Sequence, residues 1–184
     1  MSQSGLGEQR NENQGEAIPA QPGSKSFQLR QKMVSIGNDY WIENEKGEHI
    51  YEVDGKIGFK KVFYFNDAQG KKLAKLRKHF IAVKETMEVE GADGKTLAVV
   101  RKDLFTPFKE HFSVSLSNGR SLEIHGNILD HEYAIREGQT RVAQVSKKLL
   151  HLRDSYSIVI EPGQDEVVLL SVVVCIDEMT HPGN

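Results

Sequence analysis

The sequence predicts a mainly β fold: a closed antiparallel barrel of about twelve strands around a central hydrophobic helix near the C-terminus. Three observations lead to this prediction. Short segments of strand-like composition follow one another along most of the chain, with turn residues between them. Several of them alternate apolar and polar residues, as strands with one buried face do. The last segment, residues 167–176, reads VVLLSVVVCI and contains nine apolar residues of ten.

The first 25 residues differ from the rest of the 184-residue chain. They are rich in Gly, Gln, Asn and Glu, so apolar burial cannot offset the entropy cost of ordering them. We therefore expect a disordered tail over residues 1–25 and a single barrel domain over residues 26–184. The tail lacks the basic and apolar regions of a signal peptide, so we expect a cytoplasmic protein that can attach peripherally to a membrane.

Twelve strand candidates fill the domain in chain order: 27–34, 40–43, 49–53, 61–65, 71–78, 81–89, 96–102, 111–116, 122–125, 131–136, 140–145 and 155–160. In the sixth candidate, Ile81, Val83, Met87 and Val89 are expected to share one face. The clearest hairpin surrounds Asn118-Gly119, a pair that supplies the positive φ angles of a type I′ turn. Residues 146–154 suit either a helical turn or an extended link.

A weak internal repeat runs through the middle of the domain. Gly70, Gly94 and Gly119 are spaced 24 and 25 residues apart, and each is followed by a basic residue and then, two positions later, by a leucine. This is the size of a hairpin within one sheet and not that of a helical repeat unit. The repeat predicts equivalent turns at the three glycines.

The terminal apolar segment suits a strand, a membrane span or a helix buried on every side. Its ten residues fall short of the roughly 18 that a span requires. Six of them are Val or Ile, which favours a strand, whereas Asp165 as N-cap, Glu166 in the first turn and Met179 as an extension favour a helix. We predict the helix. Because it is apolar all round, the strands must wrap it, and a closed barrel does so without leaving sheet edges.

The only cysteine of the chain, Cys175, lies inside this segment. It excludes a disulfide framework and a CxxC metal pair. We expect it to act as a small buried apolar residue.

Three stretches resemble the LURP-one-related family: HIYEVDGKIG (49–58), NDAQGKKLAKLRK (66–78) and DEVVLLSVVVCIDEM (165–179). The resemblance covers residues 27–181. The family is similar in architecture to the tubby C-terminal and phospholipid scramblase domains, which implies a twelve-stranded barrel around a central helix. Tubby relatives bind phosphoinositides through basic residues, and scramblases act at membranes with a calcium-binding segment. No such calcium segment matches here and no tubby lipid site maps residue by residue, so neither activity is carried over.

Enzyme motifs are absent from the sequence: GxSxG, HExxH, the P-loop and the dinucleotide fingerprint are all missing. We therefore expect a protein that is not an enzyme and uses no cofactor. His125, Asp130 and His131 could converge across a turn as metal ligands, but their spacing matches no strong zinc pattern. Surface histidines at a hairpin are the preferred interpretation, so no metal site is predicted.

One charge feature stands above the background. From residue 56 to residue 78, eight basic residues accompany one acidic residue, a net charge of +7 that leaves −9 for the rest of a chain whose total is −2. Lys75 and Arg77 are expected to share an outer strand face, opposite Ala74 and Leu76. The candidate contacts for anionic lipid headgroups are Lys60, Lys61, Lys71, Lys72, Lys75, Arg77 and Lys78.

The predicted function is a non-enzymatic binding or scaffold domain with weak affinity for an anionic membrane surface or a phosphoinositide-like lipid. The alternative is a structural or protein-interaction domain with an unknown protein partner and no lipid ligand, in which the basic residues form only a solvated strand face. Nucleic acid is a weaker third partner, because the domain is net acidic and stacking aromatics are not evident outside one hairpin.

Overall fold

The computed structural model describes residues 20–31, 40–56, 62–81, 84–103, 111–147 and 155–181. Within these ranges the chain forms twelve strands followed by one helix. The elements are β1 (Lys25–Gln31), β2 (Tyr40–Asn44), β3 (His49–Lys56), β4 (Val62–Asp67), β5 (Lys72–Ile81), β6 (Lys84–Gly91), β7 (Thr96–Asp103), β8 (His111–Leu116), β9 (Ser121–Asn127), β10 (Glu132–Glu137), β11 (Thr140–Ser146), β12 (Ser155–Ile160) and α1 (Glu166–Thr180).

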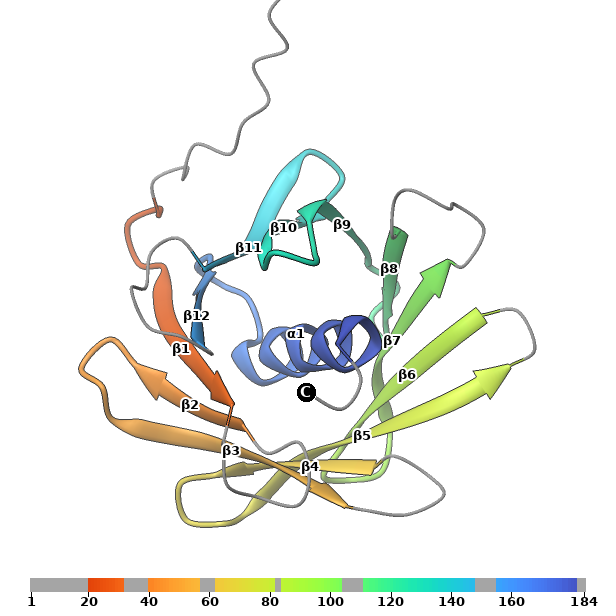
Figure 1. Cartoon of the computed structure of the whole chain (residues 1–184), viewed down its shortest axis with the longest axis horizontal. Coiled ribbons are helices and arrows are strands. Elements are labelled where there is room, and N and C mark those ends of the chain that lie inside the picture. The colour runs from red at the N-terminus through yellow and green to blue at the C-terminus, as the bar shows by residue number, and fades with distance from the viewer. Residues whose placement is uncertain are drawn as a thin grey trace, which may run out of the picture.

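Consecutive strands pair antiparallel, and β12 returns to pair with β1, which closes the barrel. The closing pair runs from Lys25 opposite Ile160 to Arg30 opposite Ser155. Figure 1 shows the strands arranged as a ring with α1 inside it. The predicted fold class, a closed antiparallel barrel around a hydrophobic C-terminal helix, is confirmed.

Four tight turns share one geometry, in which a glycine occupies the left-handed region: Gly47, Gly70, Gly94 and Gly119, with φ from 75° to 85°. In the last of them the Gly119 N–H donates to the Leu116 carbonyl at 3.0 Å, and the Leu116 N–H donates to the Arg120 carbonyl at 2.9 Å. This pattern is a type I turn followed by a left-handed glycine. The predicted type I′ turn is wrong, because Asn118 keeps a negative φ. The glycine repeat does mark equivalent turns.

Helix α1 begins as predicted at Asp165, whose side chain accepts a hydrogen bond from the Val168 N–H at 3.0 Å. It ends at His181, the C-cap residue, whose N–H donates to the Asp177 carbonyl at 2.7 Å. Every residue from Val168 to Met179 is buried, so the barrel encloses the helix on all sides. No helix in the described ranges is both long enough and apolar enough to cross a membrane.

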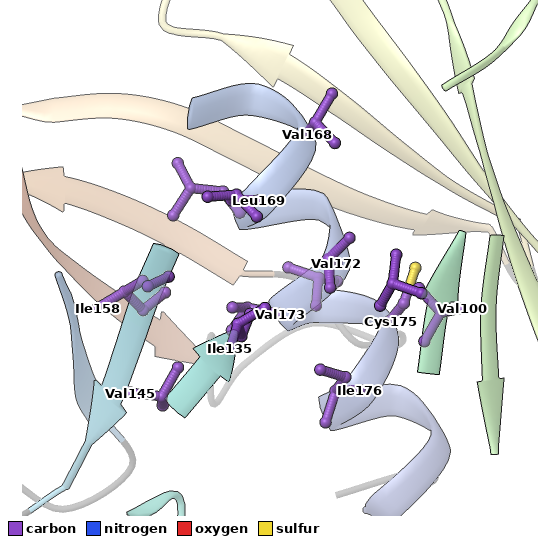
Figure 2. Close-up of a cluster of buried hydrophobic side chains, with 14 of the residues drawn as sticks. Val100, Ile135, Val145, Ile158, Val168, Leu169, Val172, Val173, Cys175 and Ile176 are labelled. Carbon is purple, nitrogen blue, oxygen red and sulfur yellow. The ribbon is translucent and has the colours of Figure 1, made fainter. Parts of the chain in front are cut away.

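The inward-facing strand residues and the helix form one hydrophobic core. Figure 2 shows side chains of the strands on both sides of the helix, with Ile135 of β10 on the side of Val173 and Val100 of β7 on the side of Cys175. Cys175 is fully buried, and burial raises the pKa of its thiol. Its predicted role as a buried apolar residue is confirmed.

One strand boundary differs from the prediction. β5 continues to Ile81, so Ile81 does not belong to the strand that carries Met87 and Val89. The latter two do share the buried face of β6. Val83 lies outside the described residues.

The two ends of the barrel carry different connections. At one end, which we call the turn end, α1 begins and the strands are joined by residues 45–48, 68–71, 92–95, 117–120 and 138–139. At the other, which we call the histidine end, α1 ends and the strands are joined by residues 32–39, 57–61, 82–83, 104–110, 128–131 and 147–154. Of the histidine-end connections, residues 128–131 and Lys147 are described.

The chain is attached to the barrel from Ser24 onward. The Ser24 hydroxyl donates to Oε2 of Glu161 at 2.6 Å. Nε of Arg141 donates to the other oxygen of the same carboxylate at 2.8 Å, and both members of this ion pair are buried. Residues 1–19 of the predicted tail lie outside the described residues.

Candidate functional site

Lys75 and Arg77 lie on the outer face of β5, while Ala74 and Leu76 between and beside them are fully buried. Alternation along the strand therefore places these two cations as the sequence predicts. The neighbouring strand decides what they contact.

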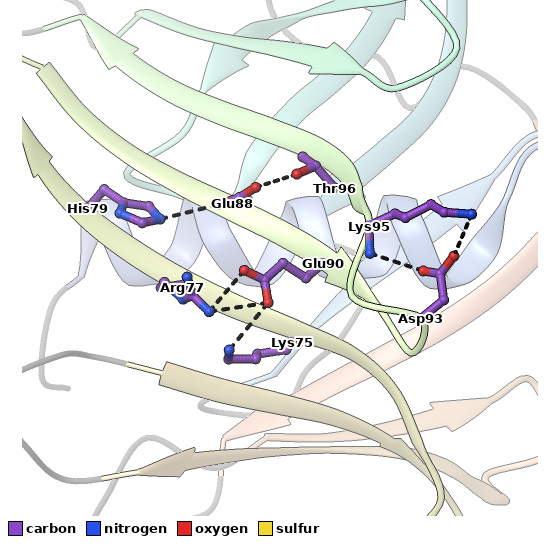
Figure 3. Close-up of polar contacts among 8 residues, drawn as sticks. All are labelled: Lys75, Arg77, His79, Glu88, Glu90, Asp93, Lys95 and Thr96. Atoms are coloured by element: carbon purple, nitrogen blue, oxygen red, sulfur yellow. Dashed lines mark hydrogen bonds and ion pairs between the residues drawn. The ribbon is translucent and has the colours of Figure 1, made fainter.

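The outer face of β6 supplies carboxylates opposite these cations. Lys75 Nζ lies 3.2 Å from Oε2 of Glu90, and an Arg77 guanidinium nitrogen lies 3.0 Å from Oε1 of the same residue. Glu88, one pair further along, contacts His79 at 3.3 Å, and Figure 3 shows the three side chains of β5 reaching toward the two glutamates. The positive excess of residues 56–78 is thus offset by the adjacent strand.

The remaining candidate cations do not gather on that face. Lys71 and Lys72 are exposed at the turn end, with Lys72 Nζ 4.0 Å from the centre of the Tyr64 ring. Lys78 is buried and forms an ion pair with Glu85. Lys60 and Lys61 lie outside the described residues. The structure therefore brings together only part of the predicted set.

A different polar cluster forms at the histidine end, where α1 ends beneath the turn between β9 and β10. Nε2 of His131 donates to Oδ1 of Asp177 at 2.8 Å, and Nδ1 of His181 lies 3.4 Å from the same oxygen. The two imidazoles stack with centroids 4.8 Å apart. One ligand atom from each of the three residues lies within 4.8 Å of the other two.

Tyrosines surround the Asp177 carboxylate. The Tyr40 hydroxyl lies 2.9 Å from its Oδ2 and 2.7 Å from Oε1 of the buried Glu178, so two carboxylates share this one donor. The Tyr156 ring stacks on His131 at 4.4 Å. Burial, followed by the charge of Asp177, raises the pKa of both Tyr133 and Tyr156, so these phenols stay neutral.

Asp177 is ionised in this setting. Burial acts to raise the pKa of its carboxyl group, but hydrogen bonds from His131, His181 and Tyr40 outweigh burial and hold that pKa at about 2. The cluster therefore presents one carboxylate and two imidazoles, which can hold a proton or coordinate a cation.

The backbone of His131 has an uncommon conformation. Its φ is 54°, the one positive value at a non-glycine residue in the described ranges. Histidine enters the left-handed region more often than most residues, at a modest cost in energy. In this conformation the His131 side chain is only 14 % exposed and contacts Asp177 near the end of α1.

His125 and Asp130 do not join this cluster. His125 is exposed on β9 and contacts Glu123 at 3.1 Å, while Asp130 accepts a hydrogen bond from Asn127. The interpretation as surface histidines fits His125, but it is wrong for His131, which packs on the helix.

These features define a class of protein, a barrel domain with its own C-terminal helix threaded through the centre and polar side chains gathered at one end. The family model described as LURP-one-related matches residues 25–177. The chain belongs to the LURP-one-related family.

Two known proteins are similar along most of their length. The chain is 25 % identical to the uncharacterized protein YxjI of Bacillus subtilis (strain 168) over 154 residues, which cover 83 % of this chain and 92 % of that protein. An X-ray structure of a protein from Arabidopsis thaliana superimposes with a TM-score of 0.62 at 18 % identity, covering 87 % of this chain and 93 % of that one. These comparisons support the family and the fold and carry no activity.

Proposed function

We propose that this domain is a non-enzymatic binding module that attaches to anionic lipid surfaces through the histidine end of its barrel. The observation that carries the proposal is the distribution of exposed apolar side chains. In the described ranges the exposed large hydrophobic residues are Trp41 and Leu129, at 39 % and 59 %. Trp41 is the second residue of β2, whose start lies at the histidine end, and its ring packs edge-on against His49 of β3, while Leu129 lies in the histidine-end turn before β10.

The sequences of the connections also contain more apolar residues at the histidine end than at the turn end. The turn-end connections, 45–48, 68–71, 92–95, 117–120 and 138–139, contain no Val, Ile, Leu, Met or aromatic residue. The structure does not describe most of the histidine-end connections, but their sequences include Met33, Ile36, Ile57, Phe59, Phe105, Phe108 and Leu150 beside Lys60, Lys61, Lys109 and Arg153. Mixed apolar and basic residues are the composition that favours the interface of an anionic membrane.

Lipid remains the proposed ligand, but its proposed contact lies at the histidine end of the barrel and not on the outer face of β5. Lys60 and Lys61 lie outside the described residues, in the sequence between Lys56, which ends β3 at the histidine end, and Val62, which begins β4 there. Lys75 and Arg77 are engaged with Glu90 on the barrel wall, so attraction of a headgroup there would first have to compete with a protein carboxylate.

The test is co-sedimentation of the full chain with phosphatidylcholine vesicles, with and without phosphatidylserine. The variant is Lys60→Glu/Lys61→Glu, and its matched control is Lys71→Glu/Lys72→Glu, which makes the same charge change at the turn end. A basic residue near an acidic surface contributes about 1 kcal/mol, so the first variant should bind at least about thirtyfold more weakly. The control should bind as the native protein does, and binding should weaken as salt screens the surface charge.

Loss in the control alone would place the contact at the turn end, and equal loss in the two variants would contradict a contact confined to the histidine end. Failure of the native protein to bind acidic vesicles at low salt would favour the alternative function, a protein-interaction domain. Thermal melts of both variants must match that of the native chain for either result to count.

A further inference from the structure

We propose that His131, Asp177 and His181 form a binding site for one divalent transition-metal cation of the zinc type. Two imidazoles and one carboxylate are a donor set that zinc sites use, with three protein ligands and one position left for water. The side chains are 14 %, 10 % and 21 % exposed, so a cation can reach them from solvent at the histidine end.

The helix contributes two of the ligands by its spacing. Asp177 and His181 are four residues apart and lie on one face at the C-terminal end of α1. A helix C-terminus carries partial negative charge and favours a cation, and the last turn of α1 holds no Lys or Arg. The Lys102 ammonium donates to the Met179 carbonyl at 2.9 Å, while Oδ2 and Oδ1 of Asp177 lie against Tyr40 and His131.

The third ligand comes from a residue held in a costly conformation. His131 takes a φ of 54°, which brings its imidazole over the helix end although the residue lies 46 positions before Asp177 in sequence. Backbone conformations of this kind concentrate at functional sites.

The surroundings orient the ligands and leave room for a water. Tyr40 binds Oδ2 of Asp177, which turns Oδ1 toward the two histidines, and partners of this kind are usual behind metal ligands. Nδ1 of His131 and the Tyr156 hydroxyl are buried and lack a hydrogen-bond partner among the described residues. Such atoms call for an explanation, and a water held by a cation with an open position would supply one.

Coordination requires one ring to turn. The two imidazoles stack nearly parallel, at 9°, whereas an ion must lie in the plane of each ring that binds it. We assign the rotation to His181, because it is the C-cap residue just beyond the end of α1, while His131 also stacks on Tyr156.

The experiment is a titration of ZnCl₂ into the full chain after removal of metals with a chelator, followed by calorimetry, and the same titration with CoCl₂ followed by visible absorption. The native protein should bind one ion and develop the cobalt bands of a low-coordinate site. Removing an outer partner of a metal site costs about 10–100-fold in affinity, so His131→Gln and His181→Gln should each lose about 100-fold or more and lose the cobalt bands. His125→Gln is the matched control and should bind as the native protein does, because its exposed imidazole contacts Glu123 alone among the described residues.

The proposal is overturned if the native protein binds no zinc, if His131→Gln and His181→Gln bind zinc as tightly as the native chain, or if His125→Gln loses as much affinity as they do. A melting temperature that rises with zinc concentration in the native chain and in His125→Gln, but not in the two ligand variants, is expected from linkage. A rise of the same size in all four proteins overturns the proposal as well.

Discussion

The hydroxyl of Tyr40, at the start of β2, lies at hydrogen-bonding distance, 2.9 Å, from Oδ2 of Asp177 in the last turn of α1, and it also contacts the neighbouring Glu178 carboxylate. The two residues are 137 positions apart, and both are buried. This hydrogen bond ties the first hairpin of the barrel to the helix that the barrel encloses, at the end where the histidines lie.

Replacing Tyr40 by phenylalanine should therefore destabilise the fold. The change removes a donor shared by the buried carboxylates of Asp177 and Glu178, at a cost of about 1–3 kcal/mol in the free energy of unfolding. Urea denaturation of Tyr40→Phe measures it. Tyr64→Phe is the control, since the Tyr64 ring lies on the outer face of β4 and its hydroxyl has no hydrogen bond among the described residues. Equal stability of the two variants would show that the Tyr40 bond contributes nothing.

A second prediction concerns the buried helix. Val173 is fully buried, so Val173→Asp places an unpaired carboxylate in the core and should cost several kcal/mol, enough to prevent folding. Circular dichroism and the soluble yield after expression report this. Val62→Asp, on the partly exposed outer face of β4, should remain folded. A soluble Val173→Asp protein that melts cooperatively would contradict the enclosed helix.

The acid limb of the stability curve should depend on Glu161. Burial acts to raise the pKa of this carboxyl, but hydrogen bonds from Ser24 and Arg141 and the charge of Arg141 outweigh it, so the pKa is lowered. A lowered pKa contributes stability above the pKa of the unfolded chain, near 4.3, and that contribution is lost as the pH falls below it. Glu161→Gln should cost about 3 kcal/mol at neutral pH, because it removes the carboxylate that forms a buried ion pair with the Arg141 guanidinium. The difference in melting temperature from the native chain should shrink between about pH 5 and pH 3. A difference that stays constant over this range would mean that Glu161 does not titrate with folding.

Gly126 should be the glycine least tolerant of substitution. Its φ is 133°, and a Cβ atom there would lie 2.4 Å from the Glu132 carbonyl oxygen across the β9–β10 pair. Gly126→Ala must therefore displace backbone and should cost several kcal/mol. Gly138→Ala, with a φ of 55° and nothing within 4 Å of the added carbon, should cost only about 1–2 kcal/mol. Chemical denaturation of both variants gives the comparison, and a smaller loss at Gly126 would contradict the close approach.

The fold was predictable because its signals are local. Alternation, the glycine turns and the Asp165 cap each depend on a few neighbouring residues, and an all-apolar helix has one way to be covered. The same alternation, carried on from Leu76, places Lys78 on the inner face, so its burial was available from the sequence. The spacing of Asp177 and His181 on one helix face was also visible.

The partners of the polar residues were not predictable, since they depend on long-range register. Glu90 meets Lys75 only because β5 and β6 pair in one particular register, with these two residues opposite each other. His131 meets Asp177 only because the β9–β10 turn adopts a left-handed residue at the barrel end where the helix finishes. Neither relationship leaves a periodic signal along the chain.

The last prediction tests the register on the outer face of β5 and β6. Lys75 and Arg77 share Glu90, with side chains that are 27 % and 33 % exposed. Lys75→Glu/Arg77→Glu would set three carboxylates together and should lower the free energy of unfolding by about 1–2 kcal/mol, since two exposed pairs are lost and replaced by repulsion.

Adding Glu90→Lys to that double variant restores opposite charges in reversed order and should recover most of the lost stability. Urea denaturation gives the free energy of unfolding of the native protein and of the double and triple variants. A triple variant no more stable than the double would show that the contact with Glu90 does not contribute to stability. The same double variant should bind acidic vesicles as the native protein does if the histidine end is the lipid contact, because its charge change lies on the barrel wall. Loss of vesicle binding in the double variant, while it remains folded at the assay temperature, would instead return the lipid contact to Lys75 and Arg77.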